Sequence, residues 1–439
     1  MAYFCSWINL KENFMNYELW IILVFLFGYG AIVFEHSLKV DKSAIALIMA
    51  GLSWTIYTIG EYYSHEVFEA LAHHLSEIAQ ILLFLIAAMT IVEVIDSHKA
   101  FDSIKSTIRT RNKVKLLWII SWVTFFLSSV LDNLTTAIVM VSLLRKIIDK
   151  REDRLFFAGL VIIASNAGGA FSPIGDVTTT MLWIGGQISA FNIIETVFLP
   201  SLVSLLLPLL YVSYLMRNDQ DIPQIVQEEE SEEKVKGTKR VFALGVLALL
   251  AAPIFKTLFH LPPYMGILFA LGILWLSVDI IHRKSLVAEQ YSTASALKKI
   301  DIASVLFFFG ILATVACLQS MGTLNNFAEI AQKFVPNQDI MVILIGLLSA
   351  IFDNVPLVAA TQGMYSLSEF PMDSKIWEFI AYTAGTGGSL LIIGSAAGVT
   401  VMGMEKISFA WYTKRISLIA LLGYLGGAAA YLLVYAMLH

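Results

Sequence analysis

The chain has 439 residues, of which 58% are hydrophobic and only 14% charged, with a net charge of −5. Soluble domains carry about 25% charged residues, so the long apolar runs predict a polytopic membrane protein. Its two cysteines, Cys5 and Cys317, exclude a disulfide framework and any CxxC or Cys/His metal motif. The sequence has no basic patch interleaved with aromatics, which argues against nucleic acid, and no P-loop, which argues against ATP.

In chain order, the apolar runs predict an all-α protein with ten full spans and two re-entrant hairpins, preceded by a short external tail, 1–18. The spans are 19–34, 43–60, 78–97, 155–186, 196–216, 241–256, 264–281, 301–320, 379–404 and 414–437. The hairpins are 116–147 and 339–366. Glycines interrupt spans 155–186 and 379–404, and the charged segment 217–240 predicts a cytoplasmic linker.

The basic residues predict the orientation of these spans. If both termini lie outside and both hairpins return to the side they enter, 25 of the 29 Lys and Arg fall inside. Residues 19–216 and 241–439 then contain the same series of elements in opposite orientation. Inverted-topology repeats are typical of secondary transporters, whose sites lie near the membrane midplane at broken helices.

Two acidic motifs occupy matched places in these halves. SSVLDNLTTA contains Asp132 and Asn133, and SAIFDNVPLVAA contains Asp353 and Asn354, 221 residues later. A carboxylate in apolar surroundings is unfavourable unless it has a partner, an ion or water. The matched pair therefore predicts a shared site.

The first interrupted span reads SNAGGAFSPIGDVTTT, and its Pro173 disrupts a regular helix. Unwound backbone at membrane depth is tolerated where protein buries it or a cavity hydrates it, and its carbonyls are hard oxygen ligands. Asp176 is expected near the N-terminus of the following half-helix, where the helix dipole favours an anion. The matching stretch TAGTGGSLLIIGSAAGVT has Ser395 at that place.

Asp132, Asp176 and Asp353 bring up to three negative charges together, and no Lys or Arg lies in the hairpin tips or breaks. Burial and mutual repulsion favour a proton on at least one of them. A site that holds either protons or a small cation is the minimal chemistry of a cation/proton antiporter, so we predict Na⁺ binding at these aspartates. The alternative is that the acids only accept backbone hydrogen bonds in the hairpin tips.

Four further titratable residues have two readings each. Glu93, in the third span, is a candidate for a proton path or for a solvated helix end. His73, His74 and Glu77 form a cluster in the polar external segment 61–77, which indicates either pH sensing or a solvated face.

The LDN and FDN hairpins, together with SNAGG…SPIGD, resemble the NhaD-type sodium/proton antiporters of the ion transporter superfamily, over nearly the whole chain. The resemblance implies two inverted repeats, a dimerising scaffold and a transport domain that moves elevator fashion. It also implies export of Na⁺, often Li⁺ as well, for incoming H⁺. We expect no cofactor. Matched by motif, it assigns ion binding to Asp132, Asn133, Thr135, Asp176, Asp353 and Asn354, together with Ser165 and Asn166.

Alternatives within and outside this superfamily remain. A Na⁺-coupled dicarboxylate symporter would bring a dianion to acidic hairpin tips, and two unit charges 4 Å apart repel by roughly 4 kcal/mol at an effective dielectric of 20. A metalloid pump lacks a thiol site, and an intramembrane enzyme lacks a nucleophile–base or metal motif, so we expect no enzymatic activity. A bacterial inner membrane and a homodimer complete the expectations.

Overall fold

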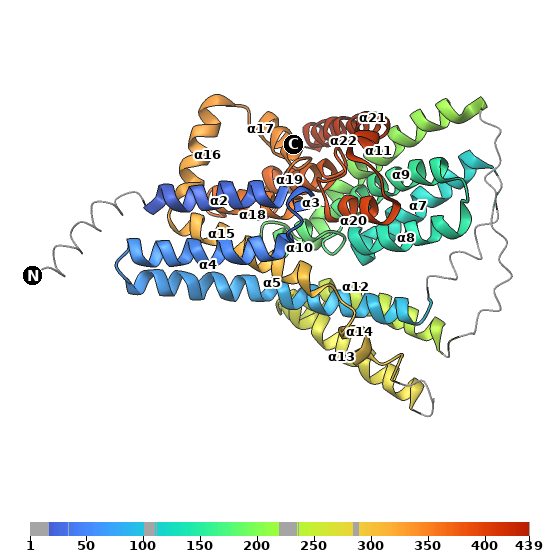
Figure 1. The fold of residues 1–439 in the computed structure, drawn as a ribbon, viewed down its shortest axis with the longest axis horizontal. Helices are drawn as coiled ribbons and strands as arrows, with labels where there is room; N and C mark the ends of the chain where they lie inside the picture. The colour runs from blue at the N-terminus through green and yellow to red at the C-terminus, as the bar shows by residue number, and fades with distance from the viewer. Residues whose placement is uncertain are drawn as a thin grey trace, which may run out of the picture. The chain divides into compact units, whose positions relative to one another are not determined.

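The computed structural model describes residues 17–33, 35–100, 110, 112–218, 235, 237–283 and 289–438. Over these ranges the regular structure is helical, and none of it is β-strand (Figure 1). Most of the predicted tail, 1–18, and of the predicted linker, 217–240, lies outside the described residues, as does Cys5.

Eight helices in the described part of the chain are long and apolar enough to cross a membrane, which supports the prediction of a polytopic membrane protein. They are α4 (Lys42–Gly60), α5 (His65–Ser97), α7 (Lys113–Leu131), α11 (Ala190–Leu215), α12 (Thr238–Phe259), α13 (Pro263–His282), α15 (Ile302–Ser320) and α22 (Ser417–Leu438). The first predicted span corresponds to the shorter apolar helix α2 (Tyr17–Val33).

Both predicted interruptions are real breaks between two helices. Span 155–186 consists of α9 (Arg151–Ala170) and α10 (Val177–Ile184). Span 379–404 consists of α19 (Lys375–Gly387) and α20 (Ala396–Glu405).

The predicted hairpins are also pairs of helices. In the first, α7 and α8 (Asn133–Ile147) meet at Asp132. In the second, α17 (Gln338–Leu348) is followed by α18 (Asn354–Met364). The 19 residues of α7 extend about 28 Å at 1.5 Å per residue. Length alone therefore does not distinguish a re-entrant arm from a crossing helix, and re-entry stays a prediction.

Several boundaries differ from expectation. The polar segment 61–77 is largely helical, because α5 begins at His65. The first turns of α5 contain many polar residues, and a search for apolar runs therefore overlooks them. The segment after span 301–320 contains the unpredicted α16 (Thr323–Phe334), and the last span begins at Ser417. Among the described residues, the remaining helices are short: α3 (Glu35–Leu38), η1 (Met216–Asn218), α14 (Thr293–Leu297) and α21 (Phe409–Arg415).

The chain divides into two compact units. Unit 1 comprises the described residues up to Leu82 together with Asp301–Pro336 and Ala359–Glu369. Within it, α4 packs against α15, and the indole of Trp54 donates to the carbonyl of Ala313 at 2.8 Å. Small residues allow this close approach, since Gly310 of α15 lies against the backbone of α4.

Unit 2 comprises Leu83–Ile300, Asn337–Val358 and Phe370–His439, of which only the described residues are considered. Within it, α7, α8 and α9 pack on one another, and α20 packs on α8 and α9. Helices α17 and α19 pack onto this same group, because α19 contacts both α9 and α17. All three aspartates of the predicted site lie in this unit.

Candidate functional site

Each helix break ends at a polar N-cap. Asp176 caps α10, accepting a hydrogen bond from the N–H of Thr178 at 3.4 Å. Ser395 caps α20, and its hydroxyl accepts from the N–H of Gly398 at 3.2 Å. The predicted position of Asp176 at the start of a half-helix is therefore confirmed, and Ser395 takes the equivalent position in the other break.

Backbone contacts between the first arm of each hairpin and the neighbouring broken helix are unusually close. A Cβ at Gly168 would lie 2.1 Å from the carbonyl oxygen of Phe125, and one at Gly387 would lie 2.0 Å from that of Gly346. Only glycine permits this approach. The motif GG, present in both halves, thus has the same packing role in each.

Two serines reinforce the same contacts. The hydroxyl of Ser128 donates to the carbonyl of Ser165 at 2.6 Å, and that of Ser349 donates to the carbonyl of Ala384 at 2.9 Å. These bonds fix each hairpin arm to the helix that enters the break. The two halves therefore share local packing, as their sequence similarity suggested.

A chain of neutral polar side chains connects the two breaks. The amide of Asn133 donates to Oδ1 of Asn166 at 3.1 Å. Nδ2 of Asn166 donates to the hydroxyls of Ser389 at 2.9 Å and Ser395 at 3.1 Å. All four side chains are buried. We call these four residues the amide chain.

Asp176 is the most buried of the three aspartates, with 2% of its surface exposed. Nδ2 of Asn354 donates to its Oδ2 at 3.1 Å. No Lys, Arg or His in the described part of the chain forms an ion pair with Asp176. Asp132 and Asp353 are near enough for their charges to repel it. Among the described residues, the Asp176 carboxylate thus has polar neighbours but no balancing cation.

Asp132 and Asp353 lie at the starts of α8 and α18. Asp132 accepts from the N–H and the hydroxyl of Thr135 at 2.8 and 2.7 Å. Its backbone φ of 93° lies in a region that a residue with a Cβ rarely adopts. Asp353 accepts from the N–H of Val355 at 3.3 Å. The strained backbone at the tip of the first hairpin is maintained by the packing around it.

The three carboxylates do not form one ready-made metal site. Among the described residues, no group of three or more His, Cys, Asp or Glu side chains is arranged to hold a metal ion. Carboxylate, amide, hydroxyl and carbonyl oxygens nevertheless gather around the breaks. Such mixed, hard oxygen donors suit an alkali cation better than a transition metal.

The chain resembles known transporters over most of its length. A family model described as citrate transporter matches residues 29–377. Sodium/proton antiporter 1 of Arabidopsis thaliana is 47% identical over 423 residues, covering 96% of this chain and 73% of that protein. Sodium/proton antiporter 2 of the same plant is 46% identical, covering 94% and 99%. The Na(+)/H(+) antiporter NhaD of Vibrio cholerae is 34% identical, covering 94% and 91%.

The chain belongs to the NhaD-type sodium/proton antiporter family. This agrees with the resemblance of the LDN, FDN and SNAGG…SPIGD motifs. Membership in the NhaD-type family, together with the eight long apolar helices, indicates a multi-pass membrane transporter.

The remaining predicted residues have varied surroundings in this NhaD-type chain. The hydroxyl of Ser165 donates to the carbonyl of Ile162 at 3.1 Å, within its own helix. Glu93 of unit 2 lies 3.3 Å from the ammonium of Lys299, whose side chain is about half exposed. That ion pair is compatible with both readings of Glu93.

His73, His74 and Glu77 do form a cluster, and it belongs to unit 1. Glu77 lies 3.4 Å from Nε2 of His73 and 3.2 Å from Nδ1 of His74. His74 also contacts the hydroxyl of Ser320 at 3.1 Å. The cluster ties α5 to α15, and pH sensing stays a prediction.

Two members of the amide chain were not predicted as site residues. Ser389 directly follows the glycine pair of the second break, and Ser395 had been aligned with Asp176 without being assigned a role. The alignment of the two breaks offered a signal for Ser395, which takes the place of Asp176, but none for Ser389, which takes the place of Ala170.

Proposed function

We propose that this protein is a secondary active antiporter that exports Na⁺ in exchange for H⁺. The names of its curated relatives support sodium/proton exchange. The observation that carries the proposal is Asp176, a buried carboxyl at a helix break with an amide donor from Asn354 and no ion-pair partner in the described chain. Such a group binds a proton when no cation is present and releases it when a cation arrives.

Proton and cation compete for the same oxygens in this proposal. Na⁺ is bound by carboxylates of Asp132, Asp176 and Asp353, aided by neutral oxygens near them. Asn133, Thr135 and Asn354 are included through their hydrogen bonds to this network. The backbone carbonyl of Ser165 accepts a hydrogen bond from Ser128. Asn166 is the bridging member of the amide chain. Because the ion and proton exclude one another, transport of one is coupled to return of the other.

Alternating access is proposed to follow from two inverted repeats, residues 19–216 and 241–439, joined by a cytoplasmic linker at 217–240. The repeated contacts at Gly168 and Gly387 support this division. The elevator movement, the homodimer, transport of Li⁺ and placement in a bacterial inner membrane with both termini outside belong to the same proposal. They are supported by the resemblance and by the distribution of Lys and Arg.

Symport of an organic anion with Na⁺ is the second candidate, because the matching family model is described as citrate transporter. The site disfavours it. Asp176 is buried and accepts a hydrogen bond from the amide of Asn354, and Asp132 and Asp353 add negative charge around it. A di- or tricarboxylate requires cationic or strongly donating surroundings.

Reconstituted vesicles distinguish the two candidates. The full chain is placed in proteoliposomes with an acidic lumen and a trapped pH dye, and NaCl or choline chloride is added outside. Antiport predicts Na⁺-dependent movement of protons out of the lumen, which Asp176→Asn abolishes. Glu329→Gln, at an exposed carboxyl of α16, serves as a control that retains exchange. Labelled citrate uptake driven by Na⁺, without proton exchange, would replace antiport with symport.

A further inference from the structure

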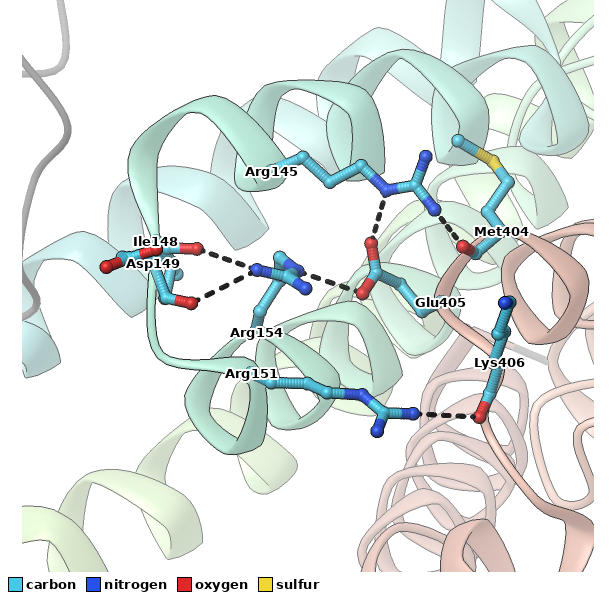
Figure 2. A network of polar contacts seen from close by, with 8 residues as sticks. All are labelled: Arg145, Ile148, Asp149, Arg151, Arg154, Met404, Glu405 and Lys406. Carbon is cyan, nitrogen blue, oxygen red and sulfur yellow. Dashed lines mark hydrogen bonds and ion pairs between the residues drawn. The ribbon is translucent and has the colours of Figure 1, made fainter.

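A buried carboxylate lies at the end of α20 that is farthest from Ser395. Glu405 is the last residue of α20, and only 2% of its side chain is exposed. The Nε of Arg145 donates to Oε1 of Glu405 at 2.6 Å, and the Nε of Arg154 donates to Oε2 at 2.9 Å (Figure 2). A carboxylate at a helix C-terminus meets the negative end of the helix dipole. Its partners, rather than α20 itself, therefore account for its position.

The two arginines come from different helices. Arg145 lies in the last turn of α8 and also donates to the carbonyl of Met404 (Figure 2). Arg154 lies in the first turn of α9 and donates to the carbonyls of Ile148 and Asp149 in the α8–α9 turn, at 3.1 and 3.3 Å. We call Arg145, Arg154 and Glu405 the arginine clamp. It joins α8, the α8–α9 turn, α9 and α20.

The same three helices are joined a second time at the candidate site. α8 begins at Asn133, α9 contains Asn166, and α20 begins directly after Ser395. Asn166 bonds to both other side chains at 3.1 Å. On each helix 10 to 12 residue steps separate this junction from the arginine clamp, which is about 15–18 Å at 1.5 Å per residue. Because a helix is stiff along its axis, a displacement at one end is transmitted to the other.

We propose that Glu405 is a positioning residue for ion binding. The inference rests on the proposed antiport function and deepens it. The arginine clamp sets the axial register of α8, α9 and α20, and thereby keeps the amide chain bonded beside the aspartates. Without the carboxylate, two guanidinium groups face each other without their shared anion, and the ends of the helices separate. Loss of an outer partner that orients ion ligands weakens ion affinity by about 10–100-fold.

Glu405→Gln tests this proposal because it removes the charge while retaining the shape. In proteoliposomes we expect the half-saturating Na⁺ concentration to rise about tenfold, with the maximal rate within about twofold of wild type. Arg151→Gln is the matched control, since Arg151 lies nearby but donates to the carbonyl of Lys406 at 3.4 Å (Figure 2). It is expected to behave as wild type. A lower melting temperature with unchanged Na⁺ affinity in Glu405→Gln would overturn the positioning role.

A double substitution adds a second criterion. Arg145→Gln acts through the same carboxylate, so the Glu405→Gln/Arg145→Gln protein is expected to have nearly the same Na⁺ affinity as Glu405→Gln alone. If the fold-changes in Na⁺ affinity of the two single variants multiplied in the double variant, the two residues would act independently. That result would contradict the proposal that the arginine clamp acts as one unit.

Amide hydrogen exchange on the purified full chain tests positioning without transport. In sodium-free buffer, the N–H of Gly398 at the start of α20 is expected to exchange faster in Glu405→Gln than in Arg151→Gln. Equal exchange would overturn the proposal. A wild-type protein that fails to exchange Na⁺ for H⁺ refutes the proposed function instead, while the Gly398 measurement still decides whether Glu405 positions α20.

Discussion

Gly168→Ala is expected to damage the candidate site through the backbone alone. The new methyl would lie 2.1 Å from the carbonyl oxygen of Phe125, whereas real Cβ contacts essentially never fall below 3.0 Å. The backbones of α7 and α9 must therefore separate by about 0.9 Å, the difference between these two distances. Overpacking typically costs about 1–3 kcal/mol. We expect Gly168→Ala to lower the free energy of unfolding by about 3 kcal/mol, since the obstructing atom belongs to the backbone.

The displacement also reaches the ion ligands, because Asp132 ends the helix that contains Phe125. Misplacement by about 1 Å lowers the rate of a positioned reaction up to about 100-fold, so we expect Na⁺/H⁺ exchange to fall at least tenfold. Denaturant titration of the purified protein measures the stability, and dye-loaded proteoliposomes measure the exchange.

Gly403→Ala provides the matched control. Gly403 is also helical, and an added Cβ there meets nothing within 4 Å. Alanine in a helix interior is about 0.5–1 kcal/mol more favourable than glycine, so this variant should be as stable as wild type or more so. If Gly168→Ala matched Gly403→Ala in both stability and exchange, the close-packing argument would be wrong.

Three other substitutions probe separate features. Asn354→Leu removes the hydrogen-bond donor to Asp176. Since a hydrogen bond to a charged group contributes about 1.5–3 kcal/mol, the half-saturating Na⁺ concentration in tracer exchange should rise at least tenfold. An unchanged value would contradict the role of this contact. Asn166→Ala leaves buried polar partners unsatisfied and should destabilise the protein by about 3 kcal/mol, so a wild-type denaturation curve would count against the amide chain. Asp41→Ala removes the N-cap of α4, with a loss of about 1 kcal/mol. Contacts with Ser43, including a hydrogen bond from its N–H at 2.7 Å, lower the pKa of Asp41. The resulting stability is present above the unfolded-state pKa of about 4 and is lost as pH falls through the folded-state pKa. The stability advantage of wild type should therefore shrink as pH is lowered below about 4, and an advantage that stays constant down to the acid limit of folding would refute this reasoning.

The parts of the fold that the sequence predicts are those governed by local chemistry. Apolar runs located the long helices, and glycines with Pro173 located the break before Asp176. An aspartate after a turn and before three threonines is a helix-start signal, and the structure has Asp176 at that cap. Hydropathy was a poorer guide to α5 and α16, whose polar turns do not form apolar runs.

Contacts between distant segments were much less accessible to sequence reasoning. Asn166 bonds to serines more than 220 residues away, and no local pattern specifies that pairing. Glu405 is the last residue of α20, and a charged residue at a helix end is ordinarily solvated. Its burial depends on the tertiary approach of Arg145 and Arg154, which neither periodicity nor spacing reveals.

The central claim is that Na⁺ and a proton compete for buried carboxylates, and direct Na⁺ binding to the purified protein tests it most simply. Calorimetric titration with NaCl in buffers of different ionisation enthalpy gives the number of protons released per Na⁺ bound. We predict net proton release for wild type near neutral pH, and its loss in Asp176→Asn. Na⁺ binding by wild type with no proton release at any pH, or equal release from Asp176→Asn, would contradict competition at Asp176.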